Sequence, residues 1–227
     1  MSKVTHERLR DEFIIILNEA KPLYAIKRME NLKILKLVHP NIIIDQKVME
    51  VIEEITTILI EYSKSLKDYK IERWIIYFLA IIIRLKQEDV LEIASRYKIT
   101  AEQLKKIDFD RTLIFQIIRN LSYETLRPSQ IYRELEILSL EGIIYLLARS
   151  RNQELKKRIN EYLFKYRNTK FLVRGKDLIG WGYPDGPFYK KALLFLEDAQ
   201  LDGLFKNMEE AKKLLENKFK NTKSKGN

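Results

Sequence analysis

The chain has 227 residues, 46% of them hydrophobic, enough for one large or two small domains with buried cores. It contains no cysteine, which excludes a disulfide scaffold, a thiol nucleophile and a Cys-ligated metal site and fits a reducing, cytoplasmic environment. The formal net charge is +10, and residues 111–227 carry nearly all of it, with 23 Lys/Arg against 14 Asp/Glu. Such a surface attracts polyanions, although a solvated lysine-rich surface has the same composition.

The first half of the chain predicts long helices, because glycine is absent before Gly142 and sharp turns are therefore few. Thr5 and Asp45 are placed to act as N-caps of the first and third helices. Pro22 suits the first turn of the second helix, which should end before His39-Pro40. Further helices are expected at residues 69–85, capped by Asp68, at 87–97, at 101–107, opened by a capping box of Thr100 and Gln103, and at 109–121.

No membrane segment is expected. The N-terminus is rich in charge and lacks the apolar region of a signal peptide. The longest apolar run, residues 74–83, covers about 15 Å of helix, which is half of a bilayer core. This run therefore predicts a buried, central helix.

The second half is also predicted to be helical, with one glycine-rich interruption. Five of the seven glycines fall between Gly175 and Gly203, and residues 174–187 read as a turn region. Helices are expected at residues 128–139, at 140–149 with Ser139 as N-cap, at 153–166, at 187–201, and after a capping box of Asn207 and Glu210. With no strand pairs or repeats, the fold class is all-α, with a boundary near residues 108–111.

The sequence contains no strong pattern of catalytic or metal-binding residues. His6 and His39 are the only histidines and lie far apart along the chain, which disfavours a histidine metal site. The adjacent carboxylates Glu53-Glu54 and Glu88-Asp89 would point about 100° apart on a helix. They are therefore more typical of a solvated helix face than of a pair that holds a metal ion. The glycine-rich region also lacks the Lys-Ser/Thr of a phosphate loop, since Trp181 follows Gly180.

Two short predicted helices around a tight turn, at residues 90–107, loosely fit a helix-turn-helix motif. The usual turn glycine is replaced by Tyr97-Lys98, and this half of the chain has almost no net positive charge. Packed core helices are therefore the favoured interpretation.

Basic residues interleaved with aromatics give the most informative pattern. Lys and Arg neutralise phosphates, and aromatic rings stack on unpaired bases. The alternative is that the aromatics are core residues and the lysines only solvate the surface, so about half of the cations are expected to touch a ligand. The candidate RNA-binding residues are Arg149, Arg151, Lys156, Lys157, Arg158, Lys170, Arg174, Lys176, Tyr183, Lys190 and Lys191.

The glycine-rich segment carries short motifs in a characteristic order. They are Gly175, Lys176-Asp177-Leu178, Gly182, Pro184-Asp185-Gly186-Pro187, Leu201-Asp202-Gly203 and Glu209-Glu210. This order resembles the C-terminal end of class II tRNA nucleotidyltransferases, the family of bacterial CCA-adding enzymes and poly(A) polymerases, apart from Asp185 inside the Pro-Gly-Pro. Arg8 and Glu12, four residues apart, match the pair that braces the neck helix of this family.

The resemblance implies an elongated array of neck, body and tail helices. Residues 1–110 would form the neck and body, residues 111–219 the basic body and tail helices that bind RNA, and residues 220–227 a disordered tail. In this family catalysis belongs to an N-terminal head with a Gly-Ser loop, an Asp-x-Asp metal pair and a Glu-Asp-x-x-Arg template. Asp108-Phe109-Asp110 has the sequence of the metal pair but lies between predicted helices. Glu88-Asp89 matches the first two residues of the template, but Glu92 occupies the position where the template has Arg.

The function implied by the resemblance is binding of tRNA, to present its 3′ end to a catalytic head on another, separately encoded chain. No catalytic residue or metal ligand is expected in this chain, and Mg²⁺ with CTP or ATP is expected only on that partner head. The alternative is a non-catalytic helical scaffold for protein interactions that has lost RNA binding.

Overall fold

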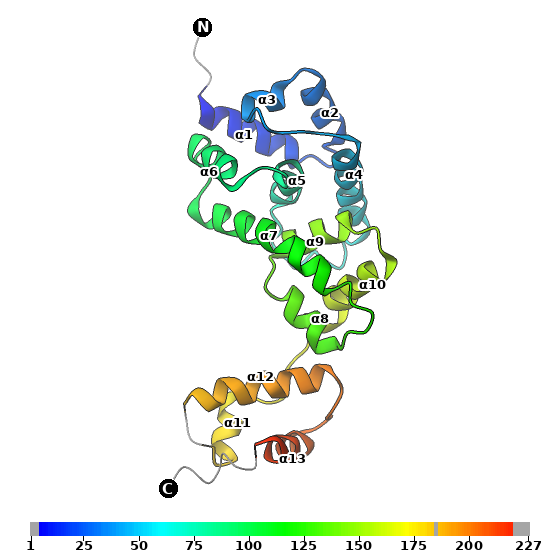
Figure 1. The fold of residues 1–227 in the computed structure, drawn as a ribbon, viewed down its shortest axis with the longest axis vertical. Coiled ribbons are helices and arrows are strands. Elements are labelled where there is room, and N and C mark those ends of the chain that lie inside the picture. The colour runs from blue at the N-terminus through cyan, green and yellow to red at the C-terminus, as the bar shows by residue number, and fades with distance from the viewer. Residues whose placement is uncertain (1–4, 184–185, 220–227) are drawn as a thin grey trace. The chain divides into compact units, whose positions relative to one another are not determined.

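The computed structural model describes residues 5–183 and 186–219. Within these ranges the chain forms thirteen α-helices and one π-helix and no β-strand, which confirms the all-α class (Figure 1). The chain divides into two compact units, each built from two segments. Unit 1 comprises Met1–Asn120 and Ile137–Lys156, and unit 2 comprises Leu121–Glu136 and Lys157–Asn227.

Unit 1 is organised around two helices that are buried on all sides. Its helices are α1 (His6–Leu17), α2 (Leu23–Asn31), α3 (Ile34–Val38), α4 (Gln46–Glu61), α5 (Arg73–Ile82), α6 (Gln87–Arg96), α7 (Ala101–Asn120), α9 (Leu140–Arg149) and the start of α10 (Gln153–Glu161). Every residue from Trp74 to Ile82 of α5 and from Leu140 to Ala148 of α9 is buried. A helix that is apolar all round belongs in a core, and α4, α5 and α9 pack against one another accordingly.

Several helix starts follow the sequence prediction. The Thr5 Oγ1 accepts the Arg8 N–H at 3.3 Å and opens α1, and the Asp45 carboxylate accepts the Val48 N–H at 3.0 Å and opens α4. The capping box of Thr100 and Gln103 opens α7, with both reciprocal bonds at 3.3 Å. These caps satisfy backbone donors that lack an intrahelical partner.

Four expected helices of unit 1 have different bounds in the structure. The predicted second helix is broken into α2 and α3 at Lys33, whose φ of 57° lies in the left-handed region. Helix α5 begins at Arg73, so residue 68 does not cap it; instead the Trp74 N–H donates to the Asn18 side chain at 3.2 Å. The two helices expected at 101–107 and 109–121 are the single helix α7, and the boundary expected at residues 108–111 therefore lies inside a helix.

Unit 2 contains α8 (Pro128–Leu135), the end of α10, the π-helix η1 (Tyr162–Tyr166), α11 (Gly175–Gly180), α12 (Pro187–Leu201) and α13 (Met208–Lys218). Its helix α12 packs on α8, α11 and α13. Leu178 of α11, Leu196 of α12 and Leu215 of α13 are buried in their common core. The helix expected at 128–139 ends at Leu135, and the one expected at 153–166 changes to a π-helix in its last turn. The predicted turn region contains the short helix α11.

The expected tail at residues 220–227 lies outside the described residues, as do Pro184 and Asp185 of the sequence motif. In the part of the chain that is described, no helix combines the length and the apolar character needed to cross a bilayer. The run at residues 74–83 is a buried helix, as the sequence predicts.

Candidate nucleic-acid interface

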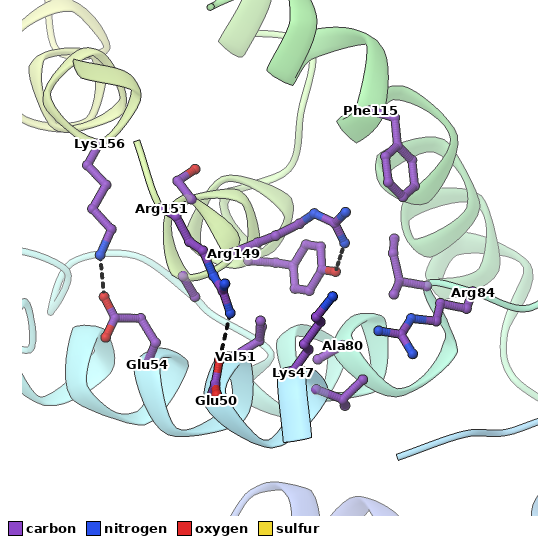
Figure 2. A pocket seen from close by; sticks show the side chains of 15 residues that line it. Lys47, Glu50, Val51, Glu54, Ala80, Arg84, Phe115, Arg149, Arg151 and Lys156 are labelled. Carbon is purple, nitrogen blue, oxygen red and sulfur yellow. Dashed lines mark hydrogen bonds and ion pairs between the residues drawn. The ribbon is translucent and has the colours of Figure 1, made fainter. Parts of the chain in front are cut away.

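Unit 1 has a cation-lined cavity of about 760 Å³, hereafter the α4–α9 cavity (Figure 2). It is walled by residues of α4, α5, α7 and α9 and by the segment that leads into α10. Among the described residues, its cationic side chains are Lys47, Arg84, Arg149, Arg151 and Lys156, and its carboxylates are Glu50 and Glu54. Positive charge is therefore in excess at its surface.

One face of α4 supplies the acidic partners, because residues three or four apart lie on the same side of a helix. Glu50 pairs with Arg151 at 2.7 Å, and Glu54 pairs with Lys156 at 2.6 Å. Both pairs are partly exposed, so each contributes about 0–1 kcal/mol to stability. Arg151 and Lys156 are thus positioned by these ion pairs but remain accessible to a competing anion.

Aromatic side chains form the opposite part of the wall. The guanidinium of Arg149 lies over the Phe115 ring, 4.6 Å from its centroid, and Arg149 also donates to the Tyr145 hydroxyl at 3.4 Å. Burial raises the pKa of the Tyr145 hydroxyl, which therefore stays protonated at neutral pH. Phe115 remains half exposed.

The structure thus brings three predicted residues, Arg149, Arg151 and Lys156, into one cavity. The sequence pattern did not indicate Lys47 of α4, Phe115 of α7 or Arg84, which follows α5. It did not indicate Tyr145 either, although this residue shares α9 with Arg149. Lys47 shares a helix face with Glu50 and Glu54, and this spacing was the available sequence signal. The contribution of Phe115 depends on tertiary packing alone.

The predicted cations of unit 2 fall into two groups. Most are exposed on its surface: Lys157, Lys170, Arg174, Lys176, Lys190 and Lys191. Arg158 instead is buried, and its guanidinium donates to the backbone carbonyls of Leu121, Tyr123 and Glu124 at 2.6–2.9 Å. Those bonds tie α10 to the segment before α8 and give Arg158 a structural role.

Tyr183 is also buried, and its ring is stacked on Phe188 with centroids 5.1 Å apart. In this position it contributes to the core of unit 2, so its role in stacking on RNA stays a prediction without geometric support. The interaction of Arg8 with Glu12 likewise stays a prediction, since both side chains are exposed on α1. Arg10 of the same helix does bridge, donating to the carbonyls of Tyr97 and Lys98 at 3.2 and 3.1 Å.

The sequence motifs of unit 2 have clear structural roles. Asp202 of the Leu-Asp-Gly motif accepts the Ser129 N–H and Oγ–H at 2.8 and 2.9 Å, so it caps α8. Gly203 follows with a φ of 73°, which favours glycine at the end of α12. Asp177 accepts the Arg174 N–H at 2.8 Å and closes the first turn of α11. These motifs build the fold of unit 2.

The remaining candidate sites take structural positions. His39 is buried, 3.6 Å from both Asp89 and Glu92, and His6 packs edge-on against Tyr97. Within residues 5–183 and 186–219, no group of three His, Cys, Asp or Glu side chains could hold a metal ion. In the helix-turn-helix candidate, Lys98 adopts a φ of 50° where glycine is usual, and α7 runs on as a packed helix.

Known proteins share sequence similarity with this chain. Residues 1–45 match a family profile described as "Probable RNA and SrmB- binding site of polymerase A". The chain is 28% identical over 208 residues to an A-adding tRNA nucleotidyltransferase of Geobacter sulfurreducens, a match that covers 89% of this chain and 24% of that protein. These similarities confirm the resemblance found in the sequence motifs.

Solved structures share the fold. The Thermotoga maritima CCA-adding enzyme, solved with tRNA, superposes with a TM-score of 0.79 over 94% of this chain at 23% identity. A CCA-adding enzyme in complex with ATP gives 0.78 over 98% of this chain at 24% identity. This chain spans about half of each of those chains and about a quarter of the Geobacter protein.

Proposed function

We propose that this chain is the RNA-binding part of a tRNA nucleotidyltransferase and holds a tRNA while a catalytic head extends its 3′ end. The observation that carries the proposal is the similarity along 89% of the chain to a protein named as an A-adding tRNA nucleotidyltransferase. The exposed cations of unit 2 and the cations of the α4–α9 cavity of unit 1 would neutralise phosphates of the tRNA. Contacts to phosphate and to the shape of the duplex would position the tRNA.

The chemistry in this proposal belongs to a head that lies outside these 227 residues. Mg²⁺ and CTP or ATP would bind to that head, since its Gly-Ser loop and Glu-Asp-x-x-Arg template are not found in this sequence. The one Asp-x-Asp run, at Asp108 and Asp110, lies within α7, where Asp110 is buried against Ser139.

Binding of a fluorescent tRNA to the full chain, measured by anisotropy across a salt series, tests the proposal. We expect binding whose affinity falls steeply as salt rises, because several phosphates release their counterions. The chain alone should incorporate no CTP or ATP into tRNA, and a co-purifying head should restore incorporation. Incorporation by this chain alone would refute the division of labour, and no binding at low salt would favour the protein-interaction scaffold.

A further inference from the structure

The α4–α9 cavity has the size and the lining of a ligand site. Its volume of about 760 Å³ lies in the range of small-molecule pockets, about 300–1,000 Å³. Polar and apolar groups converge there from α4, α5, α7 and α9, which are packed elements of one unit. The walls therefore belong to the packed core of unit 1.

The cationic side of the cavity suits a phosphate group. Lys47 is exposed on α4, one turn from Glu50, whose carboxylate holds Arg151. The Arg151 side chain is 76% exposed, so water already screens its ion pair and an incoming phosphate can exchange for the carboxylate. Lys156, held by Glu54, stands beside it (Figure 2).

The aromatic side of the cavity suits a planar ring. Phe115 is 47% exposed, and the Arg149 guanidinium lies over it at 4.6 Å. Bases stack on aromatic rings and on guanidinium planes alike. An acidic peptide would use the cations but would leave this flat surface without a partner.

We propose that the α4–α9 cavity binds one unpaired nucleotide, with its phosphate on Lys47, Arg151 and Lys156 and its base stacked on the surface made by Phe115 and Arg149. The nucleotide comes from a single-stranded stretch of RNA or from a free nucleotide, since both present the same groups. Binding of a nucleotide that belongs to an RNA strand rests on the proposed function, whereas binding of a free nucleotide does not.

Binding of two labelled probes to the full chain tests the proposal: a single-stranded RNA nonamer and an abasic nonamer of the same charge. We expect the RNA to bind about tenfold more tightly than the abasic strand, as stacking of one base provides. Phe115→Leu, which removes the ring and keeps an apolar side chain, should reduce this preference to about twofold, and Phe115→Tyr should keep it. Lys47→Glu should weaken the binding of both probes.

The matched control is Lys105→Glu, which reverses an exposed cation of α7 outside the cavity and should preserve the base preference. AMP and inorganic phosphate serve as competitors. Displacement of the RNA by AMP but not by phosphate, lost in Phe115→Leu, would support the same nucleotide site. Saturable AMP binding without a preference for RNA over the abasic strand would assign the cavity to a free nucleotide.

Equal binding of both probes without saturable AMP binding would overturn the inference. Displacement of the RNA nonamer by an acidic nonapeptide, from the wild type and from Phe115→Leu alike, would also overturn it. Labelled tRNA in the same assay separates the two proposals. If tRNA binds with a steep salt dependence and the base preference is absent, only the cavity assignment fails. If tRNA does not bind, the proposed function fails, and the AMP titration alone decides the cavity.

Discussion

Units 1 and 2 both carry cations that the sequence marks as RNA-binding, but they use these cations differently. In unit 1, Arg149 and Arg151 line a cavity, each beside an aromatic or acidic partner from another helix. In unit 2, Lys190 and Lys191 are exposed on α12, whereas Arg158 is buried and bonded to backbone carbonyls. A run of cations therefore predicts a basic surface, while burial decides which members are available to a ligand.

The buried charges of the two units differ as well. Unit 1 buries the carboxylates of Asp110 and Glu141, which bond to Ser139 and to Lys106 respectively. Unit 2 buries the guanidinium of Arg158. Because desolvating a charge is costly unless it is bonded, removing the partners of any of these groups should destabilise its unit.

The largest expected effect comes from removing the buried cation of unit 2. Arg158→Ala leaves the carbonyls of Leu121, Tyr123 and Glu124 without their donor, and bonds to charged groups contribute about 1.5–3 kcal/mol each. We expect the free energy of unfolding of unit 2 to fall by about 3 kcal/mol or more. Trp181 fluorescence during urea unfolding, in a Trp74→Phe background, measures this loss.

The neighbouring Lys157→Ala is the matched control, because Lys157 is exposed on the same helix. Its effect on the unfolding free energy should stay within about 0.5 kcal/mol. A loss of tRNA binding by Arg158→Ala with unchanged stability would show that Arg158 contacts RNA and would break the contrast between the two groups of cations.

A second contrast concerns one glycine in each unit. A Cβ at Gly142 of α9 would lie 2.5 Å from the Asp110 Cγ, and that short side chain is fixed by the Ser139 N–H at 3.0 Å. At Gly180 of α11, a Cβ would meet nothing within 4 Å. We expect Gly142→Ala to destabilise unit 1 by about 1–3 kcal/mol, as overpacking does.

Gly180→Ala should be neutral or slightly stabilising, since alanine favours helix more than glycine does. Denaturant unfolding of both variants, with Trp74 reporting on unit 1 and Trp181 on unit 2, makes the comparison. Equal effects at the two positions would show that the close approach of α7 and α9 at Gly142 is relaxed in solution.

Local patterns were sufficient to predict much of the fold. The caps at Thr5, Asp45 and Ser139 depend on residues three apart, and α12 begins at Pro187 and ends at Leu201 as its apolar spacing predicts. The fold class and the buried helix α5 also follow from apolar periodicity and the late glycines. These features need no knowledge of distant contacts.

Two of the errors arose where a distant residue decides the local structure. Trp74 is capped by Asn18, 56 residues away, so α5 starts later than a local cap would place it. A boundary was expected near residues 108–111, yet the Asp110 carboxylate accepts from Ser139, 29 residues away, and α7 continues through this segment. The cavity joins Lys47, Phe115 and Arg149 from three helices, and no sequence spacing connects them.

The exposed lysines of α12 test whether unit 2 holds phosphates. Lys190→Ala together with Lys191→Ala should weaken tRNA binding and reduce the slope of log affinity against log salt by about 2. The effect should not depend on RNA sequence, because phosphates carry no sequence information. Lys213→Ala, an exposed cation of α13, is the control. An unchanged slope in the double variant would show that these two lysines do not contact phosphates.

The smallest expected effect is a pH dependence of unit 1. Burial raises the pKa of the Asp110 carboxyl above its ordinary value of 3.8, against the lowering effect of its bonds to Ser139. The folded state therefore binds a proton more readily than the unfolded state, so protonation stabilises unit 1. Relative to Asp110→Asn, the wild type should gain unfolding free energy as pH falls from neutral through the raised pKa toward 3.8. Urea unfolding of both proteins across that range measures the difference, and a difference that stays constant would mean that water reaches the carboxylate between α7 and α9.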